Sequence, residues 1–513
     1  MSFLPGDYVE EPDLVFGHKK EEKDPRIGLK YLGPYFYDDE PGPTPSQVKV
    51  GIVSDAATTT LTKRFLDSLK SPIISQSRIT NKWLYPDFPG ISLETPIKCE
   101  FRLSDNWNVT LKETEIEEVG RISNANERIA AGVNLYRDAV QKIADGDDKP
   151  GVIICALPAL IEEKCGISIW TRGAKVPQFT ELEELAAEMA KENQSLLNEW
   201  GFGLEEEPSP PPSDRDLDFH NALKGKIMKF HIPIQLLLTS TIQGFLDGDS
   251  QRRREIQEPA TVAWNFGTAA YYKAEGKPWR LAKLRLDTCY VGISFYRNLR
   301  NPDRDVETSM AQVFTYNGEG MVLRGKDVVK DRITKEVHLS RSQAKELMTD
   351  ALKKFQDKAG YDAGRVVVHK TSLFSDEESA GFDEAIGKRY RDYVTIQRKN
   401  DIRFLRTGIY PVLRGTMVCL TGNKCVLYTS GYIPRVRTYP GSRIPEPLLV
   451  THRGDSELKE VCKEIMGLTK LNWNTTAFAT SLPITLEFAR KVGKILSELE
   501  EEQPPESHYR FYM

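Results

Sequence analysis

The secondary structure that the sequence predicts changes character at Trp279, and this change constrains the fold more than any other feature. Before Trp279, short apolar strands alternate with amphipathic helices, as in GVIICALP, which reads as a buried strand. The strands expected here are 48–55 and 151–158, the helices are 58–71, 126–146 and 261–276, and a helix runs into a strand over 219–238. Such alternation is typical of a doubly wound α/β domain with a parallel sheet.

After Trp279, four strands follow one another before the first helix. The strands predicted there are 281–287, 289–297, 311–317, 320–325 and 364–374, with more between 392 and 433. The helices predicted are 338–360, 376–390, 455–466 and 480–502. Strands first, and then helices that pack on a mixed sheet, are the order of an RNase H-like domain. We therefore predict an α/β chain in which a Rossmann-like domain precedes an RNase H-like domain.

The chain has 513 residues, which is too long for one hydrophobic core. We place an irregular or short-stranded segment at 1–45, the first domain at 46–278 and the second at 279–513. Within the first domain, an acidic helical stretch at 179–207 is broken by PSPPPSDRD, because proline cannot continue a helix. We interpret 170–217 as an insertion.

Composition excludes several classes of protein. No run of about 18 apolar residues is present, so we expect no membrane span. The acidic N-terminal residues lack the apolar core of a signal peptide. Seven cysteines occur without a C-x-x-C pair, which indicates neither a disulfide framework nor a zinc site. We therefore expect a cytoplasmic protein with reduced thiols.

Charge is unevenly distributed along the chain. The net charge is −4, but residues 219–445 contain 38 Lys and Arg against 24 Asp and Glu. The rest of the chain contains 32 against 50. A basic middle in an acidic chain is typical of a channel for a polyanion. The alternative is an ordinary fluctuation of charge along a long sequence.

Four polar residues in the first domain predict an anion site. His220 and Lys224 are four residues apart and therefore neighbours on one helix face. Gln235 begins an apolar strand, where a buried amide must find partners, and Lys273 lies late in a separate helix. Together these side chains would surround an anion with hydrogen-bond donors. The alternative is that the cations are solvated and the amide bonds to the backbone.

The same residues carry a resemblance to a known family. The order H-x3-K, I-P-x-Q and Y-Y-K-A-x-G-x-P-W resembles the MID domain of Argonaute proteins. CYVGISFYR, VVVHKTS and LNWNTTAFATSLPITLEFARKVGKIL look like the three main stretches of a PIWI domain. With PDLVFGHKKEEKDPRIGLKYLGPY near the start, the resemblance covers almost the whole chain. The sequence resembles a short prokaryotic Argonaute, built from MID and PIWI domains with no PAZ domain.

The resemblance implies a role for each of the four polar residues. His220, Lys224, Gln235 and Lys273 occupy the positions that bind the 5′ phosphate of a guide strand in this family. The C-terminal carboxylate, here that of Met513, would reach a Mg²⁺ ion beside that phosphate, and the apolar FYM ending could bury it.

The resemblance also implies that target cleavage is lost. Active PIWI domains cut by two-metal catalysis, which needs several carboxylates around two cations. Ser294, Thr371 and Arg490 stand where those metal ligands are expected. Neutral hydroxyls are poor ligands for Mg²⁺, and a cation cannot hold one. We therefore expect the chain itself not to be an enzyme.

A PIWI protein that does not cut must act through a partner. The resemblance implies a 5′-phosphorylated guide RNA, a complementary single-stranded DNA target, and a separate effector protein with an Argonaute-associated (APAZ-like) region. Effectors of this kind include NAD-consuming TIR or sirtuin-like proteins and nucleases, which act in defence against plasmids and phage. Arginine alternates with tyrosine in 388–406 and 434–443, a composition suited to phosphate contacts and base stacking.

Two alternatives remain open at this stage. One is a guide-directed nuclease with an unorthodox metal site. The other is a guide-independent nucleic-acid-binding protein that has kept only the fold.

Overall fold

The computed structural model describes thirteen segments of the chain, and the expected insertion at 170–217 lies outside them. The described residues are 6–35, 45–75, 83–165, 218–247, 258–297, 307–315, 318–327, 329–330, 337–398, 401–438, 445–496, 498 and 508–513. No helix in these segments is both long and apolar enough to cross a membrane.

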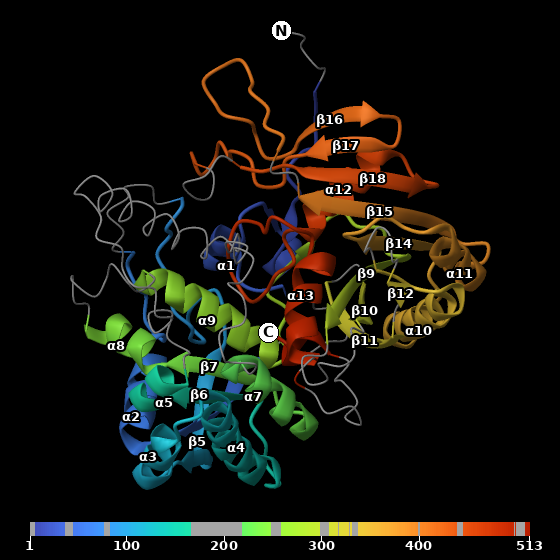
Figure 1. The fold of residues 1–513 in the computed structure, drawn as a ribbon. Helices are drawn as coiled ribbons and strands as arrows, with labels where there is room; N and C mark the ends of the chain where they lie inside the picture. The colour runs from blue at the N-terminus through green and yellow to red at the C-terminus, as the bar shows by residue number, and fades with distance from the viewer. Residues whose placement is uncertain are drawn as a thin grey trace, which may run out of the picture.

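A four-stranded parallel sheet forms the centre of the first half of the molecule, in the order β5-β4-β6-β7 (Figure 1). Its strands are β4 (Gln47–Ser54), β5 (Glu100–Thr110), β6 (Val152–Leu157) and β7 (Ile234–Leu238). The helices of this half are α2 (Ala56–Ser68), α3 (Glu113–Arg121), α4 (Ala125–Ala144), α5 (Ala159–Lys164), α7 (Phe219–Ile227), α8 (Thr239–Asp247) and α9 (Pro259–Lys273). The parallel sheet with helical connections confirms the predicted Rossmann-like architecture.

A nine-stranded mixed sheet forms the second half, in the order β1-β16-β17-β18-β15-β14-β9-β10-β11. Its strands are β1 (Asp7–Tyr8), β9 (Thr288–Arg297), β10 (Glu307–Phe314), β11 (Gly320–Asp327), β14 (Arg365–Lys370), β15 (Tyr390–Arg398), β16 (Thr416–Thr421), β17 (Lys424–Leu427) and β18 (Leu448–Gly454). A separate two-stranded ribbon joins β12 (Val329–Lys330) to β13 (Val337–His338). Strand β14 runs parallel to β9 and β15, and all other neighbours are antiparallel.

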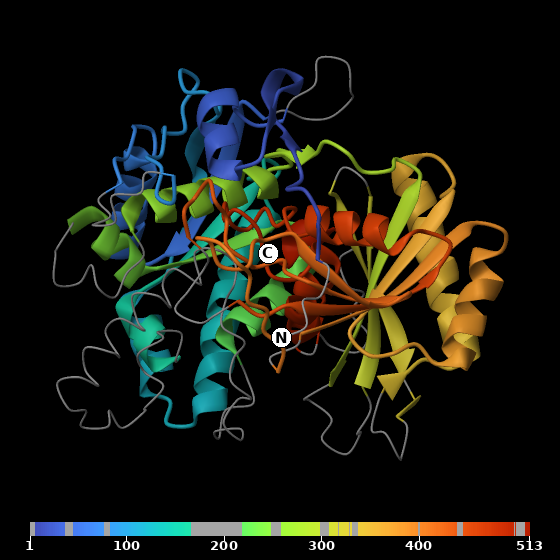
Figure 2. The same ribbon diagram turned by 90° about the horizontal axis from the view of Figure 1, so that it is seen from above.

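Helices cover both faces of this large sheet (Figure 2). Helices α10 (Arg341–Ala359) and α11 (Asp376–Ile386) pack on one face, where they meet Val291 and Val368. Helices α12 (Leu458–Leu468) and α13 (Ile484–Leu496) pack on the other, with Tyr290 and Val367. Because side chains alternate along a strand, Gly292 and Ser294 point toward α13. A side chain at Gly292 would overlap the main-chain oxygen of Thr485, so glycine allows α13 to approach the sheet.

The N-terminal segment is tied to distant parts of the chain. Strand β1 forms an edge of the large sheet, and β2 (Leu14–Val15) pairs with β3 (Glu21–Glu22) and with β8 (Arg280–Leu281). Between β1 and β2, the carboxylate of Glu11 accepts hydrogen bonds from Arg414 at 2.7 Å and Lys470 at 2.6 Å. The sequence predicted an irregular or short-stranded segment at 1–45, and the described part of it contains short strands and also the helix α1 (Pro25–Leu32).

Several elements differ from the sequence prediction. The strand predicted at 281–287 is wrong: β8 contains only its first residue, and Leu286 is 57% exposed, because the alternating apolar residues there find no partner strand. Helices α1 (Pro25–Leu32) and α3 and strand β5 were not predicted. Strand β5 is the edge of its sheet, so its exposed polar side chains hide the apolar alternation of a strand.

Helix α9 joins the two halves. Nearly all its residues are buried, as expected for a helix that is apolar on every side. The indole of Trp264 donates to the carbonyl oxygen of Pro86 at 3.1 Å, and the Asn265 side chain accepts from the Thr476 amide at 3.0 Å. The ring of Tyr272 packs 4.7 Å from that of Trp473. Helix α9 therefore fixes the loop before α13 relative to the smaller sheet.

We expect Arg365→Met to destabilise the protein by about 3–5 kcal/mol, because it leaves buried Asp392 without its cation. Arg365 donates to Asp392 at 2.7 Å and to Glu464 at 3.0 Å. Burial alone would raise the pKa of Asp392, but hydrogen bonds from His452 and Ser456 and the charge of Arg365 hold that pKa well below its usual value. The free energy of unfolding, measured with denaturant, checks this prediction.

The exposed pair Arg285–Asp287 provides the matched control, and Arg285→Met should cost less than about 1 kcal/mol. Because the pKa of Asp392 is lowered, its contribution is present above about pH 4 and is lost in acid. The variant should therefore lose less stability in acid than the wild type. Equal losses for Arg365→Met and Arg285→Met would contradict the prediction.

Candidate anion-binding site

The structure brings together the four residues predicted to bind an anion. His220 and Lys224 lie on α7, Gln235 is the second residue of β7, and Lys273 is the last residue of α9. The ammonium group of Lys273 donates to the side-chain oxygen of Gln235. The charges of Lys224 and Lys273 both act on the imidazole of His220, so all four residues belong to one cluster.

The last residues of the chain complete the cluster. The short helix η5 (Tyr509–Phe511) leads to Tyr512 and Met513, which are both buried. The ammonium group of Lys224 donates to the main-chain oxygen of Tyr512 at 3.3 Å and to that of Met513. Figure 1 shows the C-terminus beside α7, β7 and α13. The apolar FYM ending is buried, as the sequence indicated.

Local sequence explains how α7 presents its cations. The carboxylate of Asp218 caps the helix by accepting the Asn221 amide at 2.9 Å. Phe219, Leu223 and Ile227 are buried and fix which face of the helix meets the core. The spacing of four residues then places His220 and Lys224 on the same side of α7.

Both lysines are almost completely buried, Lys224 at 4% exposure and Lys273 at 1%. Burial lowers the pKa of Lys273 to about 7. Burial also lowers the pKa of Lys224 well below its usual value, and the charges of Lys273 and Lys491 lower it further. A buried ammonium group is costly unless an anion accompanies it.

Comparison with other buried lysines shows what this cluster lacks. Lys370 pairs with Glu378 at 2.6 Å, and Lys470 pairs with Glu11 at 2.6 Å. Within the described residues, no Asp or Glu side chain lies within 4.0 Å of the ammonium group of Lys224 or Lys273. The cluster therefore concentrates positive charge without a side-chain carboxylate, and a bound anion would offset that cost.

His220 responds to the same environment. Although its side chain is exposed, the surrounding protein desolvates the imidazole and lowers its pKa well below 6.5, and Lys224 and Lys273 lower it further. An anion beside the ring would act in the opposite direction and favour the imidazolium form. His220 can therefore donate to an anion from either protonation state.

Two details of the cluster were not predicted. Gln235 accepts from Lys273 and donates to the main-chain oxygen of Leu236 at 3.1 Å, so it orients the lysine and keeps one N–H for a ligand. Lys491 on α13 adds a third lysine, whose charge reaches both His220 and Lys224. No local pattern marks Lys491, because only the packing of α13 against α7 brings it here.

Two of the three positions expected to replace metal ligands lie at the end of β14, and the third lies on the helix α13. Ser294 is on β9, Thr371 follows β14 directly, and Arg490 lies within α13. Because β9 and β14 are parallel with Ile293 opposite Lys370, Ser294 within β9 lies next to the end of β14, which Thr371 follows. The hydroxyl of Ser294 is buried without a hydrogen-bond partner among the described residues. The same residues contain no group of three or more His, Cys, Asp or Glu that could hold a metal ion.

In the segment 388–406, which is expected to contact nucleic acid, acidic side chains neutralise only some of the basic residues. Arg391 pairs with Asp383 at 2.6 Å and Arg403 pairs with Glu446 at 2.9 Å. Lys388, Tyr390 and Arg406 are exposed. These side chains provide charge and an aromatic face at the surface.

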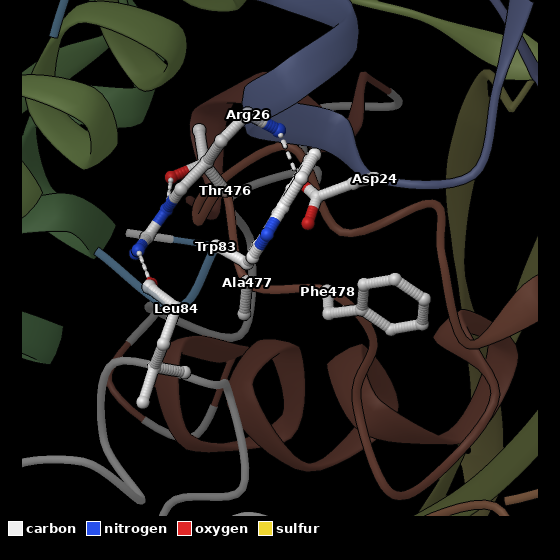
Figure 3. A pocket seen from close by; sticks show the side chains of 7 residues that line it. All are labelled: Asp24, Arg26, Trp83, Leu84, Thr476, Ala477 and Phe478. Carbon is white, nitrogen blue, oxygen red and sulfur yellow. Dashed lines mark hydrogen bonds between the residues drawn. The ribbon is translucent and has the colours of Figure 1, made fainter. Parts of the chain in front are cut away.

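A recess beside α1 is a poor candidate for nucleotide binding (Figure 3). Arg26 crosses it and donates to the Thr476 hydroxyl at 3.0 Å and the Leu84 carbonyl at 3.1 Å. The space that remains is that of about one water molecule. The side chain of Arg26 therefore fills the recess and links α1 to the loop before α13.

Comparison with known proteins defines the class of fold. No family model and no curated protein match the sequence. Clostridium butyricum Argonaute bound to a guide DNA and a 19-mer target DNA matches with 15% identity and a TM-score of 0.60, over 97% of this chain and 54% of that chain. Drosophila Piwi matches with 12% identity and a TM-score of 0.57, over 99% and 56%. A. aeolicus Argonaute matches with 14% identity and a TM-score of 0.55, over 98% and 54%.

The chain therefore spans about half the length of the solved structures that it matches. At this identity the similarity concerns the fold. The chain has the α/β fold of the MID and PIWI domains of Argonaute proteins, which confirms the predicted fold class.

We expect Lys273→Met to weaken the stabilisation of the protein by inorganic phosphate. In the free protein, the lowered pKa of Lys273 means that the unfolded chain binds more protons between about pH 7 and 10.4, so stability should rise with pH over that window. The substitution should reduce this rise, because methionine carries no proton. The thermal midpoint, measured against pH with and without phosphate, checks both effects.

Lys142→Met, at an exposed position on α4, is the matched control and should leave both effects unchanged. A phosphate-dependent rise of the thermal midpoint that is as large in Lys273→Met as in the wild type would show that phosphate binds elsewhere.

Proposed function

We propose that this chain is a non-slicing, short Argonaute-like protein that binds the 5′ phosphate of a guide strand in the anion-binding site. The guide is RNA, and it pairs with a complementary single-stranded DNA target of a plasmid or phage. The chain itself recognises the target, and a separate effector protein acts on the result.

One observation carries the proposal. Lys224 and Lys273 are buried together without an Asp or Glu side chain within 4.0 Å in the described part of the chain, in an Argonaute-like fold. A terminal phosphate has up to two charges and several acceptor oxygens, so it suits a buried cluster of donors better than a single carboxylate does. Clostridium butyricum Argonaute is itself bound to a guide and a target DNA. That neighbour supports a nucleic acid as the source of the phosphate.

The buried chain end is compatible with a Mg²⁺ ion at the guide phosphate. The main-chain oxygen of Met513 lies at Lys224, and oxygen is the ligand atom that Mg²⁺ prefers. The terminal carboxylate of Met513 would hold the ion, which supplies positive charge that Lys224 alone does not provide. Lys224 orients that oxygen by its hydrogen bond, and Lys273 and His220 neutralise the phosphate.

The residues at the PIWI position support binding without cutting. Ser294 and Thr371 have hydroxyls where two-metal catalysis needs carboxylates. Arg490 adds a cation on α13, the helix that contacts both β9 and β14. Pairing of the guide with its target must then activate another protein, which carries out the reaction. The proposed partner contains an Argonaute-associated region and an effector domain, either an NAD-consuming enzyme or a nuclease.

We predict that His220→Ala combined with Lys224→Ala weakens binding of a 5′-phosphorylated guide RNA by about 2–4 kcal/mol, because charge-assisted hydrogen bonds to the phosphate are lost. A guide of the same sequence with a 5′ hydroxyl should be affected much less. Equilibrium binding of the two guides, measured at one fixed salt concentration, checks the prediction.

Lys229→Ala is the control, since Lys229 is exposed near the end of α7 and donates to no residue of the cluster. It should leave the preference for the 5′ phosphate intact. If the double variant lost affinity equally for both guides, the phosphate site would be wrongly assigned and guide-independent binding would be favoured.

We predict that Ser294→Asp combined with Thr371→Asp does not restore cleavage of a guide-matched target in Mg²⁺ or Mn²⁺. Two carboxylates would then stand next to each other, one within β9 and one directly after β14, but Arg490 would still oppose metal binding. A labelled target strand, incubated with guide-loaded protein, reports any cut. A guide-directed product from the wild type would instead establish a nuclease with an unorthodox metal site.

A further inference from the structure

Three cysteines converge at the edge of the large sheet, away from the anion-binding site. Cys419 lies on β16, Cys425 on β17 and Cys462 on α12, and all are free thiols. The sulfur atoms of Cys425 and Cys462 are 3.4 Å apart, and both residues are completely buried. Cys419 is exposed and stands directly opposite Cys425 in the β16–β17 pairing.

The geometry of this cluster suits bond formation. A disulfide has a sulfur–sulfur distance of about 2.05 Å, so Cys425 and Cys462 need to approach by only about 1.4 Å. Opposite residues of an antiparallel pair have Cα atoms about 4.5–5.5 Å apart, which lies within the range that disulfides span. Cys425 can therefore reach either Cys419 or Cys462 through rotation of side chains.

We propose that Cys425 and Cys462 form a reversible disulfide when the protein meets a small-molecule disulfide such as oxidised glutathione, and that Cys419 is the point of entry. The Cys419 thiolate attacks one sulfur of the oxidant and releases one thiol. Cys425 then attacks the Cys419 sulfur and releases the second thiol. Cys462 finally attacks Cys425 and returns Cys419 to the thiol form. Two protein thiols are oxidised, and one oxidant disulfide is reduced to two thiols.

Solvent accessibility determines which of the three cysteines reacts with the oxidant first. Cys425 and Cys462 are completely buried where β17 packs against α12, so an oxidant cannot reach them directly. The neighbouring thiol of Cys425 and burial both raise the pKa of Cys462, so this thiol is not the first to react. Burial raises the pKa of the Cys419 thiol as well, so Cys419 reacts first because it is accessible and not because it is acidic. Cys419 is the member of the cluster that solvent reaches, and exchange depends on such access.

The bond would tie the sheet edge to a helix that supports the rest of the fold. Helix α12 contains Glu464, which pairs with Arg365, and it leads into Lys470, which pairs with Glu11. Strand β17 lies beside β16, on which the N-terminal strand β1 is added. A covalent link between β17 and α12 would therefore stiffen the region where the N-terminal segment joins the edge of the sheet. This inference does not depend on guide binding.

The test is oxidation of the full chain with oxidised glutathione, followed by alkylation, digestion without reductant and mass spectrometry. We expect a peptide linked through Cys425 and Cys462, a loss of two of the seven thiols, and a higher thermal midpoint that dithiothreitol reverses. Cys419→Ser should form the same bond about tenfold more slowly. Cys462→Ala should stop at a Cys419–Cys425 bond or at a glutathione adduct on Cys419.

The wild-type protein alone tests whether the Cys425–Cys462 bond forms, even if the Cys462→Ala variant does not fold. Accumulation of glutathione on Cys419 without a Cys425–Cys462 peptide would overturn the proposed bond. Formation of that peptide at the same rate in Cys419→Ser and in the wild type would overturn the role of Cys419 as the point of entry.

Discussion

The burial of α9 on almost all sides is the constraint on which the rest of the structure depends. A helix without a polar face cannot lie on the surface, so the two sheets must meet around it. Its middle bonds to Pro86 on one side and to Thr476 on the other, and its end packs Tyr272 against Trp473. The same burial places Lys273 at the junction of the two halves. The position of the anion-binding site is thus a consequence of how the domains pack.

The buried lysines in the described part of the chain fall into two groups that differ in their partners. Lys370 and Lys470 are matched by side-chain carboxylates, which makes their ion pairs costly to break but stable as they stand. Lys224 donates instead to main-chain oxygens of Tyr512 and of the last residue, Met513, and Lys273 donates to the amide oxygen of Gln235. Such an arrangement lowers stability in the free protein and increases the gain from binding an anion. Sites that sacrifice stability in this way are commonly functional.

The proposed absence of cutting concerns the strands of the PIWI-like half that lie next to α13. Strand β14 ends beside the middle of β9, and both strands contact α13, so two carboxylates placed at Ser294 and Thr371 would lie close together. The hydroxyl side chains of Ser294 and Thr371 do not supply the negative charge that two cations require. In the proposed function, the chain retains the surface that positions a guide–target duplex and leaves the chemistry to a partner.

The sequence by itself determined the periodic elements and indicated the four residues of the candidate anion-binding site. The strand GVIICALP, the apolar stripe of α7 and the buried helix α9 all follow from local patterns, and so does the spacing of His220 and Lys224. Edge strand β5 was not predicted because its exposed side chains are polar. The strand predicted at 281–287 was wrong because only its first residue, Leu281, pairs with another strand among the described residues. Only the tertiary structure decided that Lys491 and the main-chain oxygen of Met513 join Lys224. These groups are far apart in the sequence, and their approach depends on packing across the domain junction, which no local pattern encodes.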